Sequence, residues 1–190
     1  MSIGYLTTKN TPMVWRGPMA SGALQQMLMQ TLWKDVDYLI VDMPPGTGDI
    51  QLTLAQKAPV DGAVIVTTPQ DIALLDARKG IEMFRKVNIP VIGVVENMAV
   101  HICKNCGQEE TIFGEGGGEK VALQYDTTVL GQLPLSLAIR QMSDAGQPTV
   151  ASDPDGPEAQ LFLSTAQKLA VALWAKDIQS AGGFPSISDD

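Results

Sequence analysis

Short runs of aliphatic residues alternate with longer stretches of helical periodicity along most of the chain. Three runs are almost continuous in Val, Ile, Leu and Ala, at residues 38–42, 62–67 and 91–96. A shorter run covers residues 128–133, and residues 2–6 are a further candidate. Aliphatic runs without polar alternation are typical of strands that are buried on both faces, as in parallel sheets between two layers of helices.

The segments between these runs have apolar residues at helical spacing, which predicts helices over residues 20–33, 50–56, 72–87, 119–125 and 157–176. This alternation of strand and helix predicts an α/β fold: a doubly wound, mostly parallel sheet flanked by helices. No internal repeat or long linker divides the chain. We therefore expect residues 1–176 to form one unit and residues 177–190 to form a flexible tail.

The charge balance narrows the possible partners. The 190 residues include 13 Lys and Arg against 21 Asp and Glu, which gives a net charge of −8. Nucleic acids and anionic membranes both bind clustered cations, so neither is expected as a partner. No aliphatic run approaches the roughly 20 residues of a membrane span, and no signal-peptide pattern opens the chain. We expect a cytoplasmic protein.

The first candidate for chemistry follows the run that ends at Asp42, because ligands of open parallel sheets bind at the carboxyl ends of the strands. The segment Asp42-Met-Pro-Pro-Gly-Thr-Gly-Asp49 places an acid before a glycine-rich turn. An Asp there holds Mg²⁺ or its water beside a nucleotide phosphate, and Gly46 and Gly48 allow the backbone to approach that phosphate closely. The alternative is an Asx turn in which Asp49 caps the next helix.

Two further strand ends predict a purine pocket. Asn97 follows the run 91–96, and its amide can both donate to and accept from the edge of an adenine base. Pro134 follows the run 128–133 and would bring backbone groups to the same base. Each feature alone is ordinary turn chemistry, as is the polar loop Thr67-Thr-Pro-Gln-Asp71 that precedes a helix. Their order along the strands favours the pocket.

The segment His101-Ile-Cys-Lys-Asn-Cys-Gly107 carries the second chemical signal. The thiolates of Cys103 and Cys106 can bind one metal ion or one edge of a cluster, but one chain lacks the four ligands of a closed site. A symmetric dimer would supply two plus two. His101 could add a further ligand, although a lone histidine is expected to be a surface loop residue. A thioredoxin-like dithiol is disfavoured because no clear helix follows the pair, and a purely structural pair is the remaining alternative.

The glycine-rich segment Gly114-Glu-Gly-Gly-Gly-Glu-Lys120 only superficially looks like a phosphate-binding loop. Glu119 stands where a Gly is required before the Lys, and Val121 stands where a Ser or Thr is required after it. The acidic side chains would also repel phosphate. We interpret the segment as a turn that opens a helix.

Taken together, these motifs and the segment Trp15-Arg-Gly-Pro18 are similar to the Mrp (ApbC-like) iron–sulfur cluster carriers, a branch of the MinD/ParA-type P-loop ATPases, from residue 1 to about residue 174. The resemblance implies a homodimer that holds an iron–sulfur cluster of the four-iron four-sulfur (4Fe-4S) type between two Cys103/Cys106 pairs. The recipients would be apo iron–sulfur proteins.

The resemblance also implies ATP and Mg²⁺ as cofactors of full-length relatives. Asp42 would position Mg²⁺ or water, and the nucleotide would contact Gly46, Gly48, Asn97 and Pro134. Arg16 falls in a nucleotide-responsive region of the family pattern, and its contact with phosphate, with the partner subunit or with a surface acid stays open.

The family's Lys- and Gly-rich Walker A loop, which lies upstream of the Trp15 motif, has no counterpart in this sequence. We therefore expect residues 1–176 to be the carboxyl-terminal portion of the ATPase domain. Alone, this portion should not hydrolyse ATP and should bind it weakly or not at all. A truncated gene product, an alternative start and an isolated domain are all compatible with this pattern. Two other functions stay open: a MinD/ParA-like positioning ATPase, which needs a basic surface or tail, and a zinc-bridged structural dimer.

Overall fold

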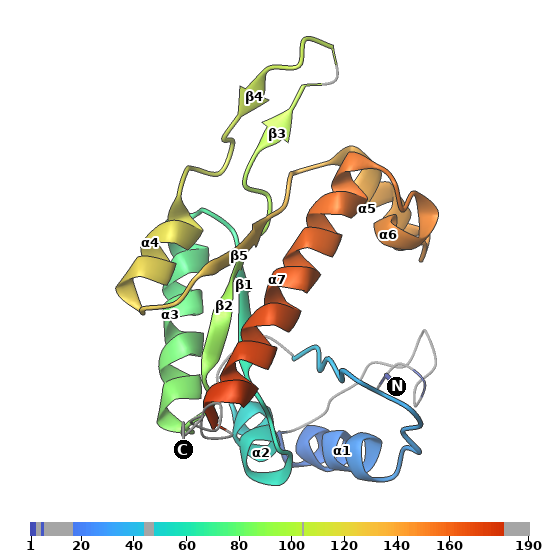
Figure 1. Ribbon diagram of the computed structural model, residues 1–190, viewed down its shortest axis with the longest axis vertical. Helices are drawn as coiled ribbons and strands as arrows, with labels where there is room; N and C mark the ends of the chain where they lie inside the picture. The colour runs from blue at the N-terminus through green and yellow to red at the C-terminus, as the bar shows by residue number, and fades with distance from the viewer. Residues whose placement is uncertain (3–4, 6–16, 44–47, 104, 181–190) are drawn as a thin grey trace, which may run out of the picture.

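A computed structural model of the chain describes residues 1–2, 5, 17–43, 48–103 and 105–180 (Figure 1). In chain order the elements are α1 (Gly17–Met29), α2 (Asp49–Lys57), β1 (Ala63–Thr67), α3 (Asp71–Lys86), β2 (Val91–Glu96), β3 (His101–Ile102), β4 (Glu109–Glu110), α4 (Gly117–Gln124), β5 (Val129–Gln132), α5 (Leu137–Asp144), α6 (Thr149–Ser152) and α7 (Pro157–Ser180). Each of the five predicted helices corresponds to one of these elements.

A parallel sheet in the order β1-β2-β5 forms the centre of the molecule. Its strands coincide with the aliphatic runs at 62–67, 91–96 and 128–133. Thr67 lies opposite Glu96, and Glu96 lies opposite Gln132, so the carboxyl ends of the three strands are aligned. The helices α3 and α4 lie in the connections from β1 to β2 and from β2 to β5. The predicted α/β fold with a mostly parallel sheet is confirmed.

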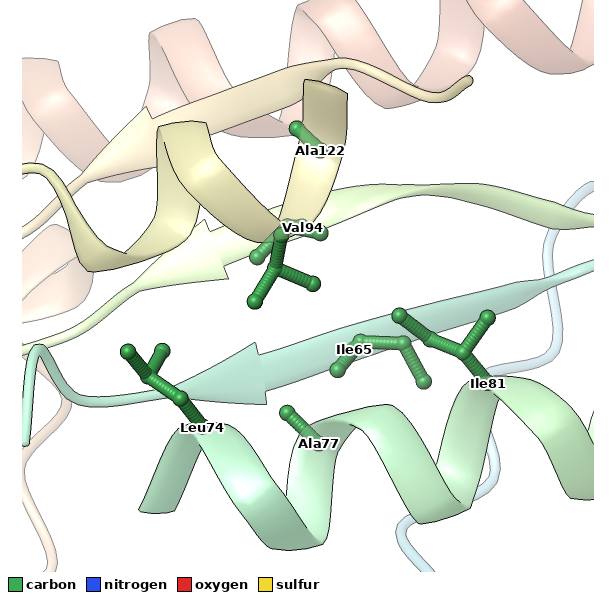
Figure 2. Close-up of a cluster of buried hydrophobic side chains, with 7 residues drawn as sticks. Ile65, Leu74, Ala77, Ile81, Val94 and Ala122 are labelled. Atoms are coloured by element: carbon green, nitrogen blue, oxygen red, sulfur yellow. The ribbon is translucent and has the colours of Figure 1, made fainter. Parts of the chain in front are cut away.

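Helices cover both faces of this sheet (Figure 1). On the other side from α3 and α4, Phe162 and Leu169 of α7 pack against Val95, Leu130 and Leu133. Burial of each large apolar side chain stabilises the fold by roughly 1.5–3 kcal/mol, and these clusters hold the three layers together. The cluster between the sheet and the helices α3 and α4 contains Ile65, Leu74, Ala77, Ile81, Val94, Val121 and Ala122 (Figure 2).

The helix predicted over residues 20–33 ends earlier, at Met29. Two side chains beyond its end turn back to bind its last carbonyl groups: Thr31 Oγ1 donates to Met27 O at 2.6 Å, and Trp33 Nε1 donates to Leu28 O at 2.9 Å. These bonds satisfy carbonyl groups that a helix end leaves without partners. Trp33, which extended the apolar pattern of the predicted helix, therefore lies beyond the helix end and binds one of its carbonyl groups.

The strand predicted at residues 38–42 is not formed. This segment pairs with none of the strands in the described ranges, and the side chains of Leu39 and Ile40 are 48% and 81% exposed. An aliphatic run becomes a strand only where a neighbour completes its hydrogen bonds and another layer buries its side chains. The expectation of a central strand ending at Asp42 is therefore wrong, and β2 is the central strand. The candidate run at residues 2–6 lies largely outside the described residues.

The sequence patterns did not predict α5, α6 or the β3–β4 hairpin, because such short elements show little periodicity. In α5, Arg140 Nη1 and Asp144 Oδ2 form an ion pair of 2.7 Å across one turn. The last helix, α7, continues past the predicted end at residue 176 to Ser180, and residues 181–190 lie outside the described part. Across the described residues, no helix has the length and apolar character to cross a membrane.

Candidate functional site

The carboxyl end of the central strand carries a buried acid, Glu96, which is 1% exposed. Its Oε1 accepts a hydrogen bond of 3.2 Å from Gln132 Nε2 at the end of β5, and its Oε2 accepts the backbone N–H of Gly118 in the first turn of α4. A buried carboxylate needs such donors to offset the loss of water. Glu96 therefore joins β2, β5 and α4 through its side chain. The sequence patterns did not indicate this role, although the acid stands at the end of a buried aliphatic run.

The glycine-rich segment opens α4, as predicted. Gly116 is the residue before the helix and has φ of +66°, a backbone conformation that favours glycine. A Cβ atom on Gly118 would lie 3.0 Å from Glu96 Oε2. Glycine here allows the helix to approach the buried carboxylate.

The two predicted purine-contacting residues lie at this same edge of the sheet. The Asn97 N–H donates to Thr67 O at 2.7 Å, and Asn97 Oδ1 accepts the N–H of Met98 at 2.9 Å. Pro134 directly follows Leu133, whose N–H donates to Glu96 O at 2.8 Å. The structure thus brings both residues together at the strand ends. Whether they bind a purine stays a prediction.

Of the residues predicted to contact phosphate, those that the structure describes do not belong to the parallel sheet, so the sheet does not place them at these strand ends. Asp42 is exposed and lies in the irregular segment described above. Gly48 is the exposed residue before α2 and Asp49 is the first helical residue, so the alternative in which Asp49 caps the helix is wrong. Gly46 and Arg16 lie outside the described residues. The proposed roles of Asp42, Gly46 and Gly48 stay predictions.

The two cysteines lie at the end of a hairpin that projects from the body of the molecule (Figure 1). His101 pairs with Glu110 and Ile102 pairs with Glu109 in antiparallel register. Beyond these pairs, the Cys103 N–H donates to Gln108 O at 2.9 Å, and the Gly107 N–H donates to Cys103 O at 2.8 Å. Cys103 is half-buried, Cys106 is exposed and both are free thiols.

The local backbone makes Cys103 a better thiolate than an ordinary cysteine. A hydrogen bond from the backbone N–H of Cys106 contributes most to lowering the pKa of the Cys103 thiol, followed by one from the backbone N–H of Asn105 and one from the Cys106 side chain. Desolvation of the thiol and, to a smaller extent, the charge on Glu110 oppose this effect and raise the pKa. Metals bind the thiolate form, so these amide groups prepare Cys103 for ligation.

A third ligand is not close to this pair within the described part of the chain, where no group of three or more His, Cys, Asp or Glu side chains could hold a metal ion. His101 is half-buried in β3, with Nδ1 3.1 Å from Leu135 O, so its expected place in a surface loop is wrong. The strand β4, and no helix, follows Gly107. The hairpin therefore offers two thiolates from one chain.

The chain as a whole is similar to a described protein family and to proteins named iron–sulfur cluster carriers. Residues 1–170 match the sequence model of a ParA family described as NUBPL iron-transfer P-loop NTPase. The chain is 68% identical over 171 residues to an iron–sulfur cluster carrier protein of Pseudomonas fragi, which covers 90% of this chain and 58% of that protein. It is 61% identical over 173 residues to an iron–sulfur cluster carrier protein of Escherichia coli K12, which covers 91% of this chain and 47% of that protein.

A solved structure supports the same relationship. The fold matches a nucleotide-binding protein of Archaeoglobus fulgidus, determined in complex with ADP and with cobalt, at a TM-score of 0.64 and 35% identity. The match covers 76% of this chain and 58% of that one. The chain thus spans about half the length of the relatives that it matches.

Proposed function

Because the chain belongs to the ParA family of NUBPL-like iron-transfer P-loop NTPases, we propose that it binds an iron–sulfur cluster and transfers it to apo iron–sulfur proteins. The cluster is cargo and not a resident cofactor. The observation that carries this proposal is the pair of free thiols at the end of the projecting hairpin. The names of the relatives, which are carriers of such clusters, support it.

The ligand set favours a cluster shared between two chains. Four thiolates satisfy the four irons of a 4Fe-4S cluster, and each chain supplies two from Cys103 and Cys106. Two chains related by a twofold axis would bring two hairpins together. We propose that this homodimer is the loaded form of the protein.

The exposed position of the hairpin suits release of the cluster. Transfer is an exchange of ligands: thiolates of the recipient replace those of Cys103 and Cys106 on iron, with no net oxidation or reduction. Each released thiolate then regains a proton. Cys106 is exposed and Cys103 half-buried, so a recipient can reach Cys106 first without unfolding the carrier.

ATP coupling is proposed only for longer relatives. There Asp42 would position Mg²⁺ or water, while Gly46, Gly48, Asn97 and Pro134 would contact the nucleotide. The position of Asn97 and Pro134 at one edge of the sheet supports the purine contact.

Anaerobic reconstitution with iron and sulfide tests the proposal. Wild-type protein should gain visible charge-transfer absorbance and then pass the cluster to an apo-ferredoxin. Cys103→Ala and Cys106→Ala should each abolish both, because two thiolates per dimer cannot hold four irons. The matched control is Ile102→Ala, since Ile102 is 49% exposed and neighbours Cys103 without offering a ligand. Binding of zinc without any cluster would favour the structural dimer instead.

A further inference from the structure

The cysteine hairpin joins the body of the molecule beside residues 133–135. Past the end of β2 the chain continues next to this segment, and backbone bonds extend the pairing of β2 with β5 beyond the strand ends. The Leu133 N–H donates to Glu96 O at 2.8 Å, the Ala99 N–H donates to Leu133 O at 2.9 Å, and the Leu135 N–H donates to Val100 O at 2.8 Å.

The next contact along this pairing comes from a side chain. Leu135 O lies 3.1 Å from Nδ1 of His101. A carbonyl oxygen can only accept, so Nδ1 carries the proton and donates. The backbone of His101 and of Ile102 already pairs with Glu110 and Glu109 across the hairpin. His101 therefore stands where the parallel pairing ends and the antiparallel hairpin begins.

We propose that His101 is a positioning residue for the cysteine hairpin: its hydrogen bond to Leu135 O fixes the direction in which the hairpin leaves the sheet. This inference rests on the proposed function, because it matters only if Cys103 and Cys106 are ligands. Two hairpins can share one cluster only if both are held in a defined direction. Groups that hydrogen-bond metal ligands directly typically contribute about 10- to 100-fold to metal affinity, and His101, which acts through the backbone of β3, is expected at the lower end of this range.

His101 is half-buried, and its ring is held by the hydrogen bond to Leu135 O. Within the described part of one chain, it does not form a three-ligand group with the two cysteines. Cys103 follows β3 directly, and its N–H donates to Gln108 O at 2.9 Å across the hairpin. A change in the direction of β3 at His101 therefore moves the backbone of Cys103 with it. Val100 and Ala99, on the body side, are held by backbone bonds that do not need the ring.

Titration with Co²⁺ under reducing, anaerobic conditions tests this role, because thiolate-to-cobalt absorbance reports ligation by cysteine. His101→Ala should weaken the apparent Co²⁺ affinity by about 10-fold, the lower end of the effect of groups that bond ligands directly. His101→Asn should recover most of the loss, because its side-chain amide can still donate to Leu135 O. The matched control Ile102→Ala should bind like the wild type. Wild-type affinity in His101→Ala, or no recovery in His101→Asn, would overturn the proposal.

Hydrogen exchange on the metal-free protein provides an independent test. In His101→Ala, the amides of Leu135 and Cys103 should exchange about 2- to 10-fold faster, as expected for loss of one hydrogen bond. The amide of Val94, which donates to Thr128 O inside the sheet at 2.8 Å, should not change. Unchanged exchange at Leu135 overturns the proposal whether or not metal binds. A wild-type protein that shows no cobalt–thiolate absorbance would count against the proposed function, and exchange would still decide the role of His101.

Discussion

The ionisation of Cys103 depends on a few neighbouring groups whose effects have opposite signs. Backbone N–H groups of Cys106 and Asn105 favour the thiolate and lower its pKa, whereas the carboxylate of Glu110 disfavours it. The spacing of the two cysteines predicts a metal site, with a structural pair as the alternative. The sequence could not reveal that the pKa of Cys103 is lowered, because the donors are backbone N–H groups whose direction depends on the turn.

The rate of alkylation of the metal-free protein as a function of pH tests whether the pKa of the Cys103 thiol is lowered. In a Cys106→Ser background, which keeps the backbone donors, the rate for Cys103 should reach half its maximum at a lower pH than the usual value, which a short reference peptide with one cysteine provides. Glu110→Gln should move this midpoint lower still, because it removes a negative charge that repels the thiolate. Glu109→Gln is the matched control, since it removes the same charge from the neighbouring residue. A midpoint at or above the usual value, or equal shifts in the two variants, would contradict this description.

At the scale of elements, the sheet could be predicted only where a run has neighbours. Runs 62–67 and 91–96 became β1 and β2 because each finds a parallel partner and a covering helix. Run 38–42 has a similar composition but finds neither among the described residues. Composition indicates which segments can form strands, but the hydrogen bonds between strands depend on residues far away in the sequence. The contacts of Glu96 with Gly118 and of His101 with Leu135 could not be predicted for the same reason.

The packing of α7 on β5 requires a residue without a side chain at one position. A Cβ atom on Gly131 would lie 2.0 Å from Thr165 Oγ1 and 3.0 Å from Thr165 Cβ. Gly131→Ala should therefore lower the free energy of unfolding by about 1–3 kcal/mol, the usual cost of overpacking. The measurement is urea unfolding followed by far-UV circular dichroism.

The matched control for this substitution is Gly22→Ala in α1, where no atom lies within 4 Å of the new Cβ. It should stabilise the protein by about 0.4–1 kcal/mol, because alanine restricts the unfolded chain. Equal stability of the two variants would show that α7 does not approach β5 as closely as the structure indicates.

At the scale of the whole molecule, charge works against association. Each chain carries a net charge of −8, so two chains repel each other at long range. Glu109 and Glu110 lie on the hairpin itself, close to where two chains would meet. We propose that pairing comes from ligands shared at the hairpin ends, and we expect the dimer to form with the cluster and to separate when the cluster leaves.

Native mass spectrometry of the anaerobically reconstituted protein tests whether two chains share one cluster, because it counts chains and irons in the same particle. We expect a particle of twice the 20.3 kDa chain mass that carries one 4Fe-4S cluster. Cys106→Ala should give only cluster-free chains. A single chain that carries a complete cluster, or a cluster that persists in Cys106→Ala, would show that the cluster is not shared between two cysteine pairs.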